Sequence, residues 1–265
     1  MYSLSTKRDM ASAVDNKSTS GVTVEDDEYR RSRARRQSSK KYLRQYFGAS
    51  SHTDISLAEI EKHGLCILLQ SNLPLAHFLH FCLKSLNSEN LFFYLEIEQF
   101  EEYRFNDVKA MKRTAMHLYD AFVKDGADFE LNLPGEVRSA TRRRIEEEDQ
   151  FCFSNVREHA IALLEPCIET FMMSQEWMEL KTVIEKTIPI NSCMYSKELR
   201  NDAVNKLVDC LEELEAQKSL LATDRAAQRR VRLLREMLHD FCKTRLRCDF
   251  HDKVRKPEEE ARNVI

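Results

Sequence analysis

Glycine and proline are scarce in this chain, whose 265 residues include only 5 of each. Average usage is roughly 7% glycine and 5% proline, so turn-rich all-β folds and the glycine-rich phosphate loops of nucleotide-binding enzymes are disfavoured. An excess of one charge is also lacking, because 41 Lys and Arg are balanced by 44 Asp and Glu. The whole-molecule charge therefore predicts no nucleic-acid partner, and the scarcity of turn residues favours a mostly helical protein.

Long apolar segments are missing as well. The longest runs, such as Leu65–Leu69, have five residues, against the roughly 20 needed to span a bilayer. Residues 1–16 mix charged residues with serine and lack the apolar stretch of a signal peptide. The eight cysteines have irregular spacing without a CxxC pair, as expected of small buried side chains in a reducing compartment. We therefore expect a cytoplasmic protein with no cofactor and no metal site.

Residues 1–54 are predicted to be a disordered N-terminal region, because residues 1–28 are poor in large apolar side chains. An acidic segment at 25–28 is followed at once by a basic run between residues 30 and 44 that contains no acid. The bases are Arg30, Arg31, Arg33, Arg35, Arg36, Lys40, Lys41 and Arg44. Each base near an anionic membrane contributes about 1 kcal/mol, which favours a peripheral position at the inner face of the plasma membrane. A solvated linker or a nuclear import signal would have the same composition.

Ser38 follows Arg35-Arg36-Gln37 and resembles a basophilic kinase site of the protein kinase A type. A phosphate on Ser38 would subtract nearly two charges from the basic run. Phosphorylation would thus weaken the attraction to an anionic membrane.

Amphipathic helices are predicted from residue 55 to about 190. Ser56 and Glu59 have the spacing of a capping box, and Gly64 is placed to end that first helix. No segment alternates apolar and polar residues as a half-buried strand would. The sequence therefore predicts an all-α bundle of short helices. Breaks between helices are predicted at 87–88, 106–107, 132–135 and near Pro166.

Residues 191–265 are predicted to be a helical extension with a frayed end. Apolar residues recur at spacings of three and four from Val204 to Leu214 and again from Val231 to Phe241, but residues 222–224 interrupt the phase. Two helices folded back on each other or docked on the bundle explain this pattern better than one coiled coil. Residues 197–250 are also a candidate surface for self-association.

Five sequence blocks carry a resemblance to a known family. The first, at 78–100, is FLHFCLKSLNSENLFFYLEIEQF, and LYDAF, ADFELNL, CF and FMMS follow at 118–122, 127–133, 152–153 and 171–174. In order and spacing they resemble the signature of the regulator of G-protein signalling (RGS) domain, FxxFLxxxxxEENLxFWxxxExF, IYxxF, EVN, CF and FLxS. The resemblance covers about residues 73–184.

The resemblance implies a bundle of about nine helices with no catalytic chemistry of its own. Domains of this family bind an active Gα subunit and hold its switch segments in the shape of the hydrolytic transition state. GTP hydrolysis by Gα is then accelerated, and heterotrimeric G-protein signalling is attenuated.

In the family the contact with Gα comes from three loops, and this sequence matches two of them. The first loop would contain Asn87, Glu89 and Asn90, although Leu86 and Asn87 replace the usual Tyr-Ser. The second would contain Asn132, whose amide both donates and accepts hydrogen bonds without adding charge near the phosphates. Taken alone, Asn90 would also fit a helix cap and Asn132 a turn.

The third loop departs from the family pattern DSYxRF. Here the segment is EPCIETF at 165–171, one residue shorter when counted from Cys152. Pro166 stands where the family has Asp, and Thr170 where it has Arg, so Glu165 and Thr170 are the groups left to contact Gα. Losing one partner of a buried charged contact costs about 2 to 5 kcal/mol. Two functions remain open: acceleration of GTP hydrolysis, and a divergent RGS-like scaffold that binds proteins without accelerating it.

Overall fold

The computed structural model describes residues 55–187, 195–219 and 225–250. Within these ranges the chain forms α-helices and two short π-helical turns and no β-strand, which confirms the all-α prediction. The basic run at 30–44 and Ser38 lie outside the described residues. The elements are α2 (Leu57–His63), α3 (Leu65–Gln70), α4 (Leu73–Lys84), α5 (Ser88–Glu102), α6 (Val108–Leu118), η1 (Tyr119–Val123), α7 (Gly135–Glu146), α8 (Ser154–Met172), α9 (Gln175–Thr187), α10 (Lys197–Ser219), α11 (Arg225–Phe241) and η2 (Cys242–Leu246).

Most helix ends lie where the sequence predicted them. The Ser56 hydroxyl accepts a hydrogen bond from the Glu59 N–H at 3.3 Å, and Gly64 ends α2 with φ of +66°, a backbone conformation that glycine adopts without strain. Asp107 caps α6 by accepting from the Lys109 N–H at 3.0 Å. The predicted breaks at 87–88, 106–107 and 132–135 are therefore confirmed.

The predicted break near Pro166 was wrong, because α8 continues through this residue. An interior proline lacks the N–H that would bond to the preceding turn, at a cost of about 3 kcal/mol. Leu164, Ile168 and Phe171 lie on one face of α8 and are 0%, 4% and 0% exposed. Burial of this stripe keeps the segment helical on both sides of the proline.

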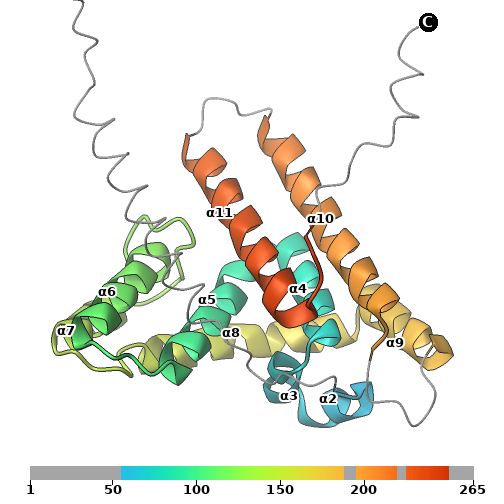
Figure 1. Cartoon of the computed structure of the whole chain (residues 1–265), viewed down its shortest axis with the longest axis horizontal. Coiled ribbons are helices and arrows are strands. Elements are labelled where there is room, and N and C mark those ends of the chain that lie inside the picture. The colour runs from blue at the N-terminus through green and yellow to red at the C-terminus, as the bar shows by residue number, and fades with distance from the viewer. Residues whose placement is uncertain (1–54, 188–194, 220–224, 251–265) are drawn as a thin grey trace, which may run out of the picture.

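Two aromatic clusters hold the bundle together. Phe171 of α8 lies against Phe78 and Phe81 of α4 and Trp177 of α9, with ring centroids 5.3 to 5.4 Å apart. A second cluster joins α5, η1 and the segment before α8 through Phe93, Phe100, Phe122 and Phe153. Because α8 or its N-terminus contributes to both, α8 connects the end of the bundle formed by α6 and α7 to the end formed by α9 (Figure 1).

Another contact between α4 and α9 is polar. The Glu176 carboxylate lies 2.7 Å from Nδ1 of His80 and 3.4 Å from Nδ1 of His77, and all three side chains are largely buried. Burial by itself raises the pKa of Glu176, but the hydrogen bonds from His77 and His80 outweigh it and lower the pKa to about 2. The carboxylate therefore stays ionised within the bundle.

The C-terminal helices pack on the bundle rather than extending away from it. Helix α10 lies along α4, and α11 folds back beside α10 (Figure 1). Arg235 of α11 makes a bidentate pair with Glu215 of α10, at 3.1 and 2.7 Å. The candidate self-association segment, residues 197–250, contributes Leu207 and Leu211 to the core. These two side chains are 0% and 1% exposed within the single chain. The predicted division of the chain at residues 54 and 190 stays a prediction.

A buried ion pair ties η2 to the bundle. The Arg245 guanidinium lies 3.0 Å from the Glu98 carboxylate of α5, and the Arg245 side chain is 5% exposed. Leu246 and Cys242, on the same turn, are fully buried. Residues up to 246 therefore contribute to the same core as α5. Of the helices in the described ranges, none is both long and apolar enough to cross a membrane.

Candidate functional site

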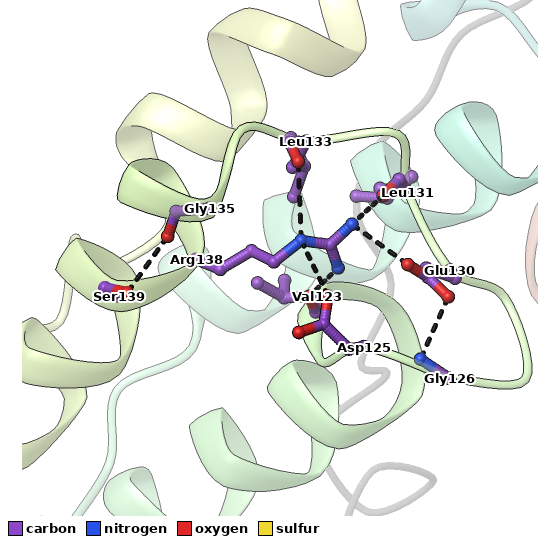
Figure 2. A network of polar contacts seen from close by, with 9 residues as sticks. All are labelled: Val123, Asp125, Gly126, Glu130, Leu131, Leu133, Gly135, Arg138 and Ser139. Atoms are coloured by element: carbon purple, nitrogen blue, oxygen red, sulfur yellow. Dashed lines mark hydrogen bonds and ion pairs between the residues drawn. The ribbon is translucent and has the colours of Figure 1, made fainter.

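The segment between η1 and α7, residues 124–134, is held by one arginine of α7. The Arg138 guanidinium donates to the carbonyl oxygens of Val123, Leu131 and Leu133 (Figure 2). It also pairs with Glu130 at 3.0 Å and with Asp125 at 3.3 Å. We call this segment the 124–134 loop. Its two ends are bound to a single side chain that is 12% exposed, so its backbone is fixed.

Asn132 is displayed by this loop. Its neighbours Leu131 and Leu133 are buried, at 1% and 8% exposure, whereas Asn132 is exposed. The Leu131 N–H donates to the Phe122 carbonyl at 2.8 Å, and the Phe129 N–H donates to the Ala121 carbonyl at 3.1 Å. The anchored leucines therefore leave the Asn132 side chain exposed.

The N-terminal end of α5 brings together Asn87, Glu89 and Asn90. Asn87, rather than Asn90, is the N-cap residue, and Asn90 lies in the first turn. The Asn90 amide donates to Oδ1 of Asn87 at 2.6 Å. A capping role for Asn90 is therefore excluded, and its 4% exposure shows that it is held inside the turn.

Two acceptor atoms in this turn are buried without a hydrogen bond. They are Oε2 of Glu89 and Oδ1 of Asn90. Unpaired buried acceptors are uncommon in native proteins, because each forfeits its bonds to water. The turn thus has unused capacity to accept hydrogen bonds.

Helix α11 contacts both of these segments. The Arg229 guanidinium donates to Oδ1 of Asp128 at 2.8 Å. The Arg230 guanidinium lies 3.9 Å from Oε2 of Glu89 and 5.5 Å from the ring centroid of Phe129. Sequence reasoning missed these arginines, because Arg229 is 101 residues from Asp128 and lies in a helix that was predicted to pack on the bundle or to mediate self-association. It also missed Arg138, whose position in an arginine-rich helix is typical of a solvated face.

The third predicted segment is a helical surface rather than a loop. Glu165 and Thr170 are both exposed on α8, and the Thr170 hydroxyl donates to the Pro166 carbonyl one turn earlier at 3.0 Å. Between them, Cys167 faces α4, with its sulfur 3.7 Å from that of Cys82. A hydrogen bond with Cys82 lowers the pKa of Cys167, and one with Asn87 adds to this effect. Burial acts in the opposite direction but is outweighed. Cys167 thereby links this part of α8 to the N-cap of α5.

Amides, carboxylates, guanidinium groups and the Thr170 hydroxyl make up the described site residues. These groups donate and accept hydrogen bonds and suit the recognition of another protein surface. The site therefore offers a preformed loop with an exposed amide and a neighbouring turn with unpaired acceptors.

Residues 64–180 match the model of the regulator of G protein signaling domain family. Residues 64–180 of the chain are therefore similar to an RGS domain. Human regulator of G-protein signaling 8 is similar to the chain, with 28% identity over 115 residues, which are 43% of this chain and 63% of that protein. The match thus spans less than two thirds of that relative.

A solved structure has the same fold. It is the rgRGS domain of PDZRhoGEF in a complex with Galpha-13 bound to GTP-gamma-S. The likeness covers 71% of this chain and 93% of that chain, with a TM-score of 0.52 and 12% sequence identity. The family match contains α4 to α8, the 124–134 loop and Asn132, but it ends before α10 and α11.

Proposed function

We propose that this protein binds an active Gα subunit and attenuates heterotrimeric G-protein signalling by accelerating GTP hydrolysis. The observation that carries the proposal is the exposed Asn132 amide on a loop that Arg138 fixes from both ends. Such an amide is ready to engage the switch region of Gα without first being ordered. Two further findings support it: the RGS domain match and the presence of Galpha-13 in the solved complex of the rgRGS domain.

In this proposal the chain supplies binding rather than chemistry. Asn87, Glu89 and Asn90 of the first segment and Asn132 of the second would contact the switch segments of Gα. Glu165 and Thr170 of α8 would contact the same partner from the third segment. Hydrogen bonds that are stronger in the transition state than in the ground state would lower the barrier for hydrolysis by Gα itself.

A second candidate is a scaffold that binds proteins without accelerating hydrolysis. The observation that favours it is the third segment, where an unbroken helix has Pro166 and Thr170 at the positions of the Asp and Arg of the family. Neither side chain supplies the positive charge of the family arginine. The two candidates share Gα or another protein as partner and differ in their effect on the hydrolysis rate.

Single-turnover GTP hydrolysis by a panel of purified Gα subunits separates the two. We expect the full chain to increase the rate for at least one Gα, and Asn132→Ala to abolish the increase. The matched control is Asn155→Ala, because Asn155 is an exposed asparagine in the first turn of α8, at the opposite end of that helix from Thr170. Acceleration that survives in Asn132→Ala, or acceleration by no variant, contradicts the GTPase-activating function.

Binding to Gα in the GDP–aluminium fluoride state and in the GDP state provides a second measurement. The proposed function requires tighter binding in the first state, because that state imitates the transition state. Equal binding in both states without acceleration would support the scaffold instead.

The basic run at 30–44 lies outside the described residues, and we propose that it brings the protein to anionic membranes. Sedimentation with vesicles that contain phosphatidylserine should exceed sedimentation with neutral vesicles. Ser38→Glu should reduce the difference, because it subtracts charge from the run.

A further inference from the structure

Helix α11 lies where a partner of the RGS domain would dock. Its arginines reach both segments that the proposed function assigns to Gα: Arg229 pairs with Asp128 beside the 124–134 loop, and Arg230 lies next to Glu89 in the first turn of α5. The guanidinium of Arg230 also lies over Phe129, at 5.5 Å from the ring centroid. One helix thus spans the two contact segments.

The contact of Arg229 with Asp128 is stronger than the contact of Arg230 with Glu89. Asp128 is 11% exposed and its pair with Arg229 has a distance of 2.8 Å, as in a charge-assisted hydrogen bond. The Arg230 guanidinium, at 3.9 Å from Oε2 of Glu89, is too far for a hydrogen bond. That oxygen and Oδ1 of Asn90 have no hydrogen bond although both are buried. Arg230 of α11 therefore approaches Glu89 without donating a hydrogen bond to it.

A partner with hydrogen-bond donors could bind the acceptor atoms of Glu89 and Asn90 that have no hydrogen bond in this structure. Lysine, arginine or backbone N–H groups of a partner segment that approach Glu89 and Asn90 would form the missing hydrogen bonds. The same approach would require Arg230 to leave its place over Phe129. The arginines of α11 and the donor groups of a partner would therefore compete for the same acceptors.

The arginines can leave without unfolding α11. Leu238 and Phe241, toward the C-terminal end of the helix, are 0% and 6% exposed, and the buried Arg245–Glu98 pair follows them. By contrast, the side chains of Arg229 and Arg230 are 40% and 47% exposed. Rotation of two half-exposed side chains is enough to open the surface while the rest of the helix stays packed.

We propose that α11 is an intramolecular competitor of Gα, in which Arg229 and Arg230 occupy the surface formed by Glu89, Asp128 and Phe129, next to Asn90. This inference rests on the proposed Gα binding and adds a regulation by α11, which lies beyond the residues matched by the RGS family model. The partner segment would carry basic or N–H donor groups. Its affinity would be reduced by the fraction of molecules in which the arginines occupy the surface.

The test measures the affinity of the full chain for Gα in the GDP–aluminium fluoride state. We expect the double variant Arg229→Gln and Arg230→Gln to bind about fivefold or more tightly than the unmodified chain, because neutral side chains no longer hold the acidic surface. The control is Lys243→Gln and Arg247→Gln in and after η2, which removes two exposed positive charges away from the surface. Circular dichroism and the melting temperature verify that each variant is folded.

Each outcome has a distinct meaning. Tighter binding by the α11 variant alone supports competition. Unchanged affinity overturns the competition and leaves the proposed function intact. Weaker binding by the α11 variant also contradicts competition, since the arginines would then contribute to binding Gα. If no variant binds any Gα, the proposed function fails and the competition fails with it.

Discussion

Arg138 permits a quantitative test of how the 124–134 loop is held. Replacing Arg138 with alanine removes the donors to the carbonyls of Val123 and Leu131, which are the closest backbone contacts of the guanidinium. The bond to Leu133, at 3.4 Å, is long and contributes less. Hydrogen bonds to charged groups contribute about 1.5 to 3 kcal/mol each.

The two carboxylates add little to this sum. Asp125 is 89% exposed and Glu130 is 40% exposed, so their pairs with Arg138 are screened by water and contribute below about 1 kcal/mol. Two strong carbonyl bonds therefore dominate, and we expect Arg138→Ala to lower the free energy of unfolding by about 3 kcal/mol. Arg138→Lys should lower it by roughly half as much, because a single ammonium group cannot reach both carbonyls in the geometry of the fork.

Urea unfolding followed by circular dichroism measures this loss. The matched control is Arg142→Ala, one turn later on α7, where the side chain pairs with exposed Glu146 at 3.0 Å and lies 5.6 Å from the Tyr119 ring. Its loss should stay below about 1 kcal/mol. Equal losses in Arg138→Ala and Arg142→Ala would refute the reasoning, because the buried carbonyl bonds would then contribute nothing beyond an exposed ion pair.

Three other substitutions test the packing of the bundle. Glu176→Gln should make the free energy of unfolding depend less on pH in acid. The pKa of Glu176 is about 2 in the folded state and 4.5 in the unfolded state, so the carboxylate contributes about 3 kcal/mol of stability above pH 4.5, and this contribution is lost as the pH falls toward 2. A wild-type pH profile parallel to that of the variant would contradict this. Arg245→Ala should cost about 3 kcal/mol in urea unfolding, since it leaves Glu98 buried without its cation; recovery in a variant that also carries Glu98→Gln is the control. Pro166→Ala should raise the free energy of unfolding by about 2 kcal/mol, because the exposed position regains the N–H that an interior helical residue donates. A lower free energy of unfolding in this variant would show that α8 requires the proline.

Local signals made much of the fold predictable. The hydroxyl of Ser56, the carboxylate of Asp107 and the missing side chain of Gly64 act within four residues of their own positions, so their roles are visible in the sequence. The predicted break at 132–135 likewise lies where α7 begins, at Gly135. Pro166 shows the limit of such signals, because the burial of Leu164 and Phe171 by distant helices outweighed a local helix breaker.

The environment of the candidate site depended on contacts between distant residues. Arg138 is one of several arginines on α7, and its pattern does not distinguish it from the exposed Arg142. Only the turn of the chain at 134–135 places it under the 124–134 loop. Similarly, the pairing of Arg229 with Asp128 joins residues 101 positions apart, and no local pattern encodes such a contact.

The packing of α10 on α4 has a consequence for synthesis of the protein. Helix α4 ends at Lys84 and α10 begins at Lys197, which is 113 residues later. At about 5 to 20 residues per second, a ribosome needs roughly 6 to 23 seconds to make the intervening chain. During that interval the face of α4 that α10 covers has no native neighbour on that side. The nascent chain therefore exposes this apolar face of α4 for several seconds before the last helices are made.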